Sequence, residues 1–344
     1  MMAPIRVRIT SMVRRLWLEY CEENSISTIK HLIMEHLGPI DRGWWIIWIS
    51  AALIMSVLSA IATYSNWVDN PIYISYEPGL KPIQAVPFPA ITICALVQNR
   101  LELFNLTLAA TRIHQNIDLE NLEYRNLRAL THVCPFVASW ISFHDKLSIP
   151  TVEILRNLSV DRETLINGCY WKTIDTNCSK MFFKTITDSG VCYTFNAMAA
   201  KTLYRLENLN QEFTYSETTR TSTDWFRESG DRSDSNFDVY PERPLGYGRK
   251  YGLEVGLVSN LNDDDLFCNG PRNGYKVLVH PPDEAPTLDH FHYRLGFRDT
   301  MLLFVKPQIT KTSLSLESQS IIDRQCFFEN ERYLRFYKIY NQHT

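Results

Sequence analysis

The sequence predicts a membrane protein of the α+β class, in which one N-terminal transmembrane helix is followed by a disulfide-bonded extracellular domain. Three observations support this fold class. Residues 44–64 form one apolar run, basic residues gather ahead of it, and seven of the eight cysteines follow it. The net charge of −3 is small for 344 residues, so the charge balance gives no indication of a nucleic-acid partner.

The apolar run at 44–64 has the length and composition of a membrane span. It contains no charged residue, proline or glycine. As an α-helix it would be roughly 30 Å long, which matches the hydrocarbon core of a lipid bilayer. Tryptophans cluster at its start, and Tyr64 and Trp67 lie at its end, as in the aromatic belts of membrane interfaces. The alternative is a buried helix of a soluble core, but such helices are seldom apolar on every face over this length.

The charges beside the span predict its orientation. Lys81 is the only basic residue between Tyr64 and Cys94, whereas several precede the span, among them Arg6, Arg8, Arg14, Arg15, Lys30 and Arg42. The positive-inside rule therefore places residues 1–43 in the cytoplasm and residues 65–344 outside.

Cysteines and glycosylation sequons agree with this orientation. Cys21 is alone on the inner side, and the outer cysteines are Cys94, Cys134, Cys169, Cys178, Cys192, Cys268 and Cys326. Disulfides persist outside the cell, and an odd number leaves one cysteine without a partner in this chain. Cys169 and Cys178 enclose a short loop that a disulfide could close. The Asn-x-Ser/Thr sequons are also all on the outer side, at Asn105, Asn157 and Asn177.

The outer chain begins with extended structure and continues into helices. Prolines between Trp67 and Pro89 predict extended chain. Residues 90–94 are β-branched or small and are bounded by proline, which predicts a strand. Region 95–168 is predicted to be mainly helical, because apolar residues recur at helical spacing with charges opposite. The two apolar faces are Leu101, Phe104 and Leu108, and then Leu119, Leu122, Leu127 and Leu130.

The second half of the outer chain has the pattern of strands and loops. Residues 211–250 are rich in Ser, Thr, Asp, Arg and Gly, which predicts a variable loop. Strands are predicted at 275–280 and 301–305. No second apolar run of spanning length occurs in the sequence.

Two groups of residues could hold a metal ion. Asp263 and Asp265 have the Asp-x-Asp spacing that binds a divalent metal in Golgi glycosyltransferases, which share the layout of one span and a lumenal domain. Neighbouring Asn and Gly-Pro residues favour a solvated turn instead. His290 and His292 would face the same side of a strand, but no third ligand is evident nearby, so surface histidines are favoured. We expect neither a cofactor nor an enzyme activity.

Four segments in order resemble the degenerin/epithelial sodium channel family, and most closely its insect pickpocket branch. Cys21–Ile29 precedes the span. Val86–Cys94 is similar to the Phe-Pro-Ala-Val-Thr-Ile-Cys signature, and Gly190–Asn196 matches Gly-x-Cys-Tyr-Thr-Phe-Asn. Arg324–Tyr337 is similar to the opening of the cysteine-rich thumb. In addition, Gly274–His280 resembles a palm strand.

The resemblance implies a subunit of a trimeric, amiloride-sensitive sodium channel in the plasma membrane. Its partners would be related channel subunits, sodium ions and the lipid bilayer. It implies a helical finger at 95–168, and a β-rich palm, a β-ball and the start of the thumb at 169–344. It also implies disulfides, in the pairs Cys94–Cys192, Cys169–Cys178 and Cys134–Cys268.

Two departures from the family pattern affect the expected function. The family has a His-Gly pair before the first span that is needed for gating, and Lys30-His31 stands in its place here. The family's second span and its Gly/Ser-x-Ser filter have no counterpart in residues 1–344. We therefore expect a fragment of a subunit; the alternatives are a non-conducting regulatory subunit of such a channel, or a single-span lumenal enzyme of the glycosyltransferase type.

Overall fold

The computed structural model describes residues 12, 15–16, 19–20, 38–70, 72, 75–76, 79, 81–143, 149–209, 216–218, 220, 240–258, 266–270, 273–289, 291–310, 312–328 and 331–339. The chain forms two compact units. One comprises Met1–Tyr76 with Ser320–Gln325, and the other comprises Glu77–Gln319 with Cys326–Thr344. Each unit is described by itself.

The first unit contains the long helix α3, Pro39–Asp69, which includes the predicted span with about one further turn at each end. Its length is about 46 Å at 1.5 Å per residue. Pro39 occupies the first helical position, where a missing N–H costs nothing, and Asp41 accepts a hydrogen bond from the Gly38 N–H at 3.3 Å. No residue of α3 is buried, and in the described part of the chain it is the one helix long and apolar enough to cross a membrane. The short helix α12, Ile321–Arg324, belongs to the same unit.

The second unit is built around a five-stranded antiparallel sheet, which we call the large sheet. Its strand order is β4-β5-β1-β7-β8. The strands are β1 Ala90–Ala95, β4 Phe182–Thr187, β5 Gly190–Phe195, β7 Tyr275–His280 and β8 Tyr293–Leu295. The predicted strands at 90–94 and 275–280 are thus confirmed, and they lie side by side although they are far apart in the sequence.

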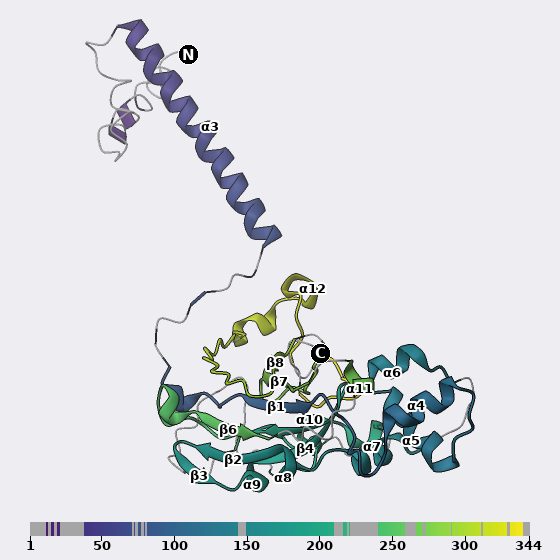
Figure 1. Ribbon diagram of the computed structural model, residues 1–344. Helices are drawn as coiled ribbons and strands as arrows, with labels where there is room; N and C mark the ends of the chain where they lie inside the picture. Colours follow the sequence, from purple (N-terminus) through teal and green to yellow (C-terminus); the bar gives the residue numbers. More distant parts are fainter. Residues whose placement is uncertain are drawn as a thin grey trace. The chain divides into compact units, whose positions relative to one another are not determined.

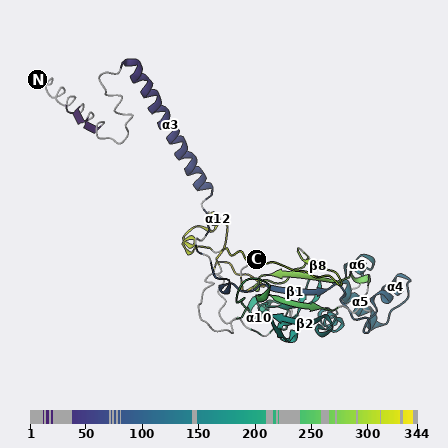
Figure 2. The ribbon, with the colours of Figure 1, turned by 60° about the vertical axis from the view of Figure 1, so that its left-hand side comes forward.

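A small sheet packs against one face of the large sheet. Its order is β3-β2-β6, with β2 Ile166–Trp171, β3 Ile174–Thr176 and β6 Leu253–Leu257. Figures 1 and 2 show β2 below β1 in both views. The core between the sheets contains Ile93, Phe182 and Phe195 from the large sheet with Ile166 and Trp171 from the small one. Alternate residues of β1 face this core, as the pleat of a strand requires.

Helices collect at one end of the sheets and form a second core (Figure 1). They are α4 Leu106–His114, α5 Asn121–Thr131, α6 Pro135–Trp140, α7 Thr151–Leu158 and α11 Leu266–Asn269. The short helix α8, Arg162–Leu165, leads into β2 instead, and its Leu165 belongs to the core between the sheets. Leu106, Leu127, Leu130 and Val137 are fully buried there. The expected helical face that began at Leu101 is wrong in part. The helix starts at Leu106, because Asn105 caps it by accepting a hydrogen bond from the Leu108 N–H at 2.8 Å.

Short helical turns complete the fold. They are η1 Ile83–Ala85, α9 Cys178–Met181, α10 Ala200–Leu203, η2 Leu206–Asn208, η3 Arg249–Tyr251 and η5 Leu314–Ser318. The segment around Phe336 returns to α10 and η2, where the Arg205 N–H donates to the Phe336 carbonyl at 2.8 Å. The Tyr204 and Tyr337 rings pack at 5.2 Å.

The strand predicted at 301–305 is wrong. These residues have no regular structure, and no described strand pairs with them. Leu302 and Phe304 are 61% and 87% exposed. An apolar run forms a strand only where a neighbouring strand supplies hydrogen bonds, and the described sheet ends at β8.

Candidate functional site

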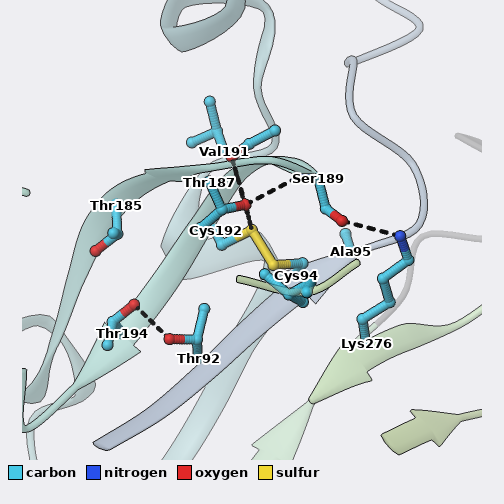
Figure 3. Close-up of a disulfide and its surroundings, with 12 residues drawn as sticks. Thr92, Cys94, Ala95, Thr185, Thr187, Ser189, Val191, Cys192, Thr194 and Lys276 are labelled. Atoms are coloured by element: carbon cyan, nitrogen blue, oxygen red, sulfur yellow. Dashed lines mark hydrogen bonds between the residues drawn. A yellow bond between two sulfur atoms is a disulfide. The ribbon is translucent and has the colours of Figure 1, made fainter. Parts of the chain in front are cut away.

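Three of the motifs found in the sequence form adjacent strands of the large sheet. The register pairs Ile93 with Tyr193, which sets Cys94 opposite Cys192 on the neighbouring strand. Their Cα atoms are 4.4 Å apart, the spacing of directly opposed residues in an antiparallel pair, and a disulfide joins them (Figure 3). Both cysteines are fully buried. The bond therefore fixes the first strand after α3 to the centre of the sheet.

Polar groups surround this disulfide at the β4–β5 turn. Lys276 on β7 donates a hydrogen bond from Nζ to the Ser189 Oγ at 2.9 Å (Figure 3). Partial burial lowers the pKa of Lys276, and the nearby carboxylates of Asp188 and Asp289 act in the opposite direction. The Asp188 carboxylate accepts hydrogen bonds from the backbone N–H groups of Leu288 and Asp289, at 3.0 and 2.8 Å. The turn thus holds the loop that follows β7 over the disulfide.

A chain of hydrogen bonds crosses the same face of the sheet and ends on His280. The Thr92 Oγ1 lies 2.9 Å from the Thr194 Oγ1 and 3.0 Å from the His280 Nε2. The His280 Nδ1 lies 2.9 Å from the Pro281 carbonyl oxygen, which only accepts, so Nδ1 carries the proton. Nε2 then accepts from Thr92, and Thr194 donates to Thr92. Burial lowers the pKa of His280 from 6.5 to about 4, so the ring is neutral at pH 7.

Asn196 joins three separate segments at the end of β5, and we call this arrangement the Asn196 clamp. Its Nδ2 donates to the carbonyl oxygens of Phe88 and Glu242, at 2.5 and 3.3 Å. Its Oδ1 accepts from the Glu242 N–H at 2.6 Å, and the Phe88 N–H donates to the Glu242 carbonyl at 2.8 Å. The Phe88 ring packs on Trp171 and Phe195, at 4.7 and 6.0 Å. The chain that precedes β1 is therefore bound to the sheet by side chain and backbone together.

The structure contains two further disulfides. Cys134, at the start of α6, is bonded to Cys268 in α11. Cys169 in β2 is bonded to Cys178, which begins α9. With Cys94–Cys192, these are the pairs that the family resemblance implies. Cys326 is a half-buried free thiol.

All three sequon asparagines have exposed side chains. Asn105 and Asn177 cap α4 and α9 through Oδ1, which accepts from the N–H groups of Leu108 and Ser179, at 2.8 Å in both cases. Asn157 lies in the last turn of α7. In the described part of the chain no hydrogen bond occupies the Nδ2 atoms of Asn105 and Asn177, so the atoms that would carry a glycan are available.

Some candidate residues lie elsewhere or outside the described residues. Lys30, His31, Asp263, Asp265 and His290 belong to the undescribed part of the chain. His292 is described, and its Nδ1 lies 2.7 Å from the Leu288 carbonyl oxygen. The His292 ring therefore helps to hold the loop before β8. No cluster of metal-ligating side chains occurs among the described residues.

A helix long and apolar enough to cross a membrane, a second unit with three disulfides, and sequence motifs joined in one sheet are features of a membrane protein with a disulfide-bonded domain beside the bilayer. Residues 20–344 match the model of the family described as amiloride-sensitive sodium channel. Because the match covers nearly the whole chain, the protein belongs to this family. The family consists of ion channels, so the glycosyltransferase alternative is not favoured.

The relatives that the chain matches include several Drosophila proteins. The chain is 24% identical to Pickpocket protein 28 of Drosophila melanogaster, over 96% of this chain and 52% of the relative. It is 23% identical to the sodium channel protein Nach of the same species, over 98% of this chain and 61% of the relative. The chain is also 22% identical to Pickpocket protein 11 of Drosophila melanogaster, over 94% of this chain and 46% of the relative. The chain thus spans about half the length of the relatives it matches.

Sequence reasoning missed the Asn196 clamp and the His280 chain. Asn196 was present as the last residue of a recognised motif, and His280 as the end of a predicted strand. A buried polar residue at the end of an apolar strand is the signal that could have drawn attention to both, because such groups need partners. Their partners Glu242 and Thr92 are 46 and 188 residues away along the chain, so the sequence does not indicate the pairing.

Proposed function

We propose that the chain supplies the first span and the outer domain of an amiloride-sensitive sodium channel subunit. Assembled with related subunits as a trimer, it would carry sodium ions across the plasma membrane. The family match across residues 20–344, which includes both α3 and the second unit, is the observation that carries this proposal. We divide the chain into a cytoplasmic segment 1–43, a transmembrane helix 44–64 and an extracellular part 65–344.

The exposed surface of α3 supports a role beside other helices. Ser56, Ser59 and Thr63 are three and four residues apart and share one face of the helix. The Thr63 hydroxyl donates to the Ser59 carbonyl at 2.9 Å, which satisfies it within its own helix. In membranes such small hydroxyl residues pack against a neighbouring helix more often than they line a pore. We therefore infer that this face contacts another span.

A current measurement in oocytes tests the proposal. Residues 1–344 expressed alone are expected to give no amiloride-blockable sodium current, because one span with no intramembrane charge offers no filter. A chimera that adds the part of Pickpocket protein 28 beyond its match is expected to conduct. A sodium-selective current from residues 1–344 alone would overturn the assignment of the filter to another span. A chimera that reaches the surface but only alters the current of a co-expressed subunit would indicate the regulatory alternative.

Glycosylation tests the orientation separately. If the basic residues before α3 hold the N-terminus inside, Asn105 and Asn157 are outside and accept glycans in microsomes. We expect a glycosidase-sensitive mass shift that decreases stepwise in Asn105→Gln and Asn157→Gln. An N-terminal tag that is protected from protease completes the test. An unglycosylated protein whose tag is digested would refute the orientation whatever the current measurement shows.

A further inference from the structure

A cavity of about 220 Å³ lies beside the Asn196 clamp. Its wall is largely aromatic and apolar, formed by Trp171, Met181, Phe195 and Tyr240. Trp171 belongs to the small sheet and Phe195 to the large one, so the cavity lies where the two sheets meet. Asn196 and Glu242, two members of the clamp, complete the lining.

The charges at this cavity are mainly positive. Lys180 and Arg220 line it and are exposed to solvent, and Glu242 is its one carboxylate among the described residues. The Glu242 carboxylate is shared, since one oxygen is 3.2 Å from the Arg220 Nη1 and the other is 3.8 Å from the Lys172 Nζ. Lys180 has no ion-pair partner within the described ranges. Among the described residues, Glu242 is thus the one acid beside two lining cations and Lys172, which lies next to the lining.

Two of these three cations, Arg220 and Lys172, lie against aromatic rings of the wall. The Arg220 guanidinium lies 5.1 Å from the centre of the Tyr240 ring, and the Lys172 ammonium lies 4.9 Å from that of Trp171. Cation–π contacts of this kind hold a charged group against a ring face. The arrangement places positive charge at the rim of an apolar cavity, which is the complement of an anion with an apolar body.

We propose that this cavity binds a small aromatic carboxylate, with the ring against Trp171 and Phe195 and the carboxylate toward Lys180 and Arg220. The volume fits one ring with a short chain, because a cavity of roughly 150 Å³ already admits benzene. Charge-assisted hydrogen bonds from Lys and Arg to a carboxylate are the strong polar contacts available there. Since Asn196 and Glu242 belong to both the wall and the clamp, an occupant stabilises the attachment of the chain before β1. The binding does not depend on conduction.

Binding of 3-phenylpropionate to the full chain in detergent micelles tests the proposal, with saturation-transfer NMR as the readout. The matched probes 3-phenylpropanol and 3-phenylpropylamine have the same ring and chain with a neutral or a cationic end. We expect the acid to bind more tightly than the alcohol, and the amine least. Arg220→Gln and Lys180→Gln should each weaken binding of the acid about tenfold, the lower range for a hydrogen bond to a charged group. Both residues are exposed, so neither change threatens folding.

Two further variants separate this cavity from other sites. Met181→Trp fills the cavity without changing a charge and should abolish binding. Lys250→Gln is the matched control, because Lys250 also lies over an aromatic ring, that of Tyr251 at 6.0 Å, but outside the cavity. It should bind the acid as the unaltered chain does. The proposal fails if the acid does not bind up to its solubility limit, if the amine binds more tightly, or if binding survives Arg220→Gln and Met181→Trp.

Discussion

Lowering the pH from 7 to 5 tests the hydrogen-bond chain that ends on His280. His280 is buried, and its pKa falls from 6.5 to about 4 because burial disfavours the charged form. The neighbouring strands present Thr92 and Thr194, which do not ionise in this range. Asp283 and Glu284, in the loop that follows, are the nearest carboxyl groups in the sequence, and both are buried.

The sign of the effect follows from the direction of the pKa shift. An unfolded chain takes up a proton on this histidine as the pH falls through 6.5, whereas the folded chain resists until about pH 4. The contribution of neutral His280 to the free energy of unfolding is therefore complete above pH 6.5 and is lost progressively toward pH 4. A difference of 2.5 units corresponds to about 3 kcal/mol in full, of which about 2 kcal/mol is lost between pH 7 and 5.

Urea unfolding followed by tryptophan fluorescence in a non-ionic detergent measures this loss. Other groups titrate over the same range, so the informative quantity is the pH dependence of the unaltered chain minus that of His280→Gln. We expect His280→Gln to remove about 2 kcal/mol of the dependence. His132→Gln is the control, because it removes an exposed histidine at the end of α5 that takes no part in the hydrogen-bond chain. Equal slopes for the unaltered chain and His280→Gln would refute a neutral, buried His280.

Two other predictions concern the large sheet. Non-reducing peptide mapping should find Cys94 linked to Cys192, and a peptide that links Cys169 to either one would contradict this. The variant with both cysteines changed to serine should lose about 4 kcal/mol of unfolding free energy, because the bond closes a loop of nearly a hundred residues. Asn196→Ala should cost about 3 kcal/mol, because it leaves buried backbone groups unpaired. The exposed Asn208→Ala, which also loses a bond to a backbone carbonyl, should cost less than about 1 kcal/mol, and equal costs would argue against the clamp.

The strands that could be predicted from the sequence are those that are marked by residues next to them in the sequence. Pro87 and Pro89 come just before β1, and β7 combines β-branched residues with a preceding glycine, Gly274. Residues 301–305 have a comparable apolar composition, but composition does not reveal whether a neighbouring strand exists. The same limit applies to the helical start, where the apolar spacing of Leu101 was followed and the cap at Asn105 was not.

The candidate site could be predicted only in part, because its contacts are long-range. The family resemblance located Cys94 and Cys192, and the register of β1 and β5 accounts for their meeting. The family resemblance did not indicate that Glu242 would approach Asn196, since the composition of residues 211–250 predicts only a polar loop. Loops with few aliphatic residues carry little pattern, and their contacts are decided by the surface on which they lie.

Asn196 shows why one residue type suits the end of the Gly-x-Cys-Tyr-Thr-Phe-Asn motif. Its φ of 62° lies in the left-handed region, which glycine, asparagine and aspartate adopt at least cost. Glycine has no side chain to bridge Phe88 and Glu242, and an aspartate carboxylate accepts but cannot donate to their carbonyl oxygens. Only an amide meets both requirements, because its oxygen accepts from the Glu242 N–H while its nitrogen donates to two carbonyls. The motif therefore ends where the backbone leaves β5 and where the chain arriving at β1 is held, and the Asn196 side chain adds its hydrogen bonds to the backbone bond between Phe88 and Glu242.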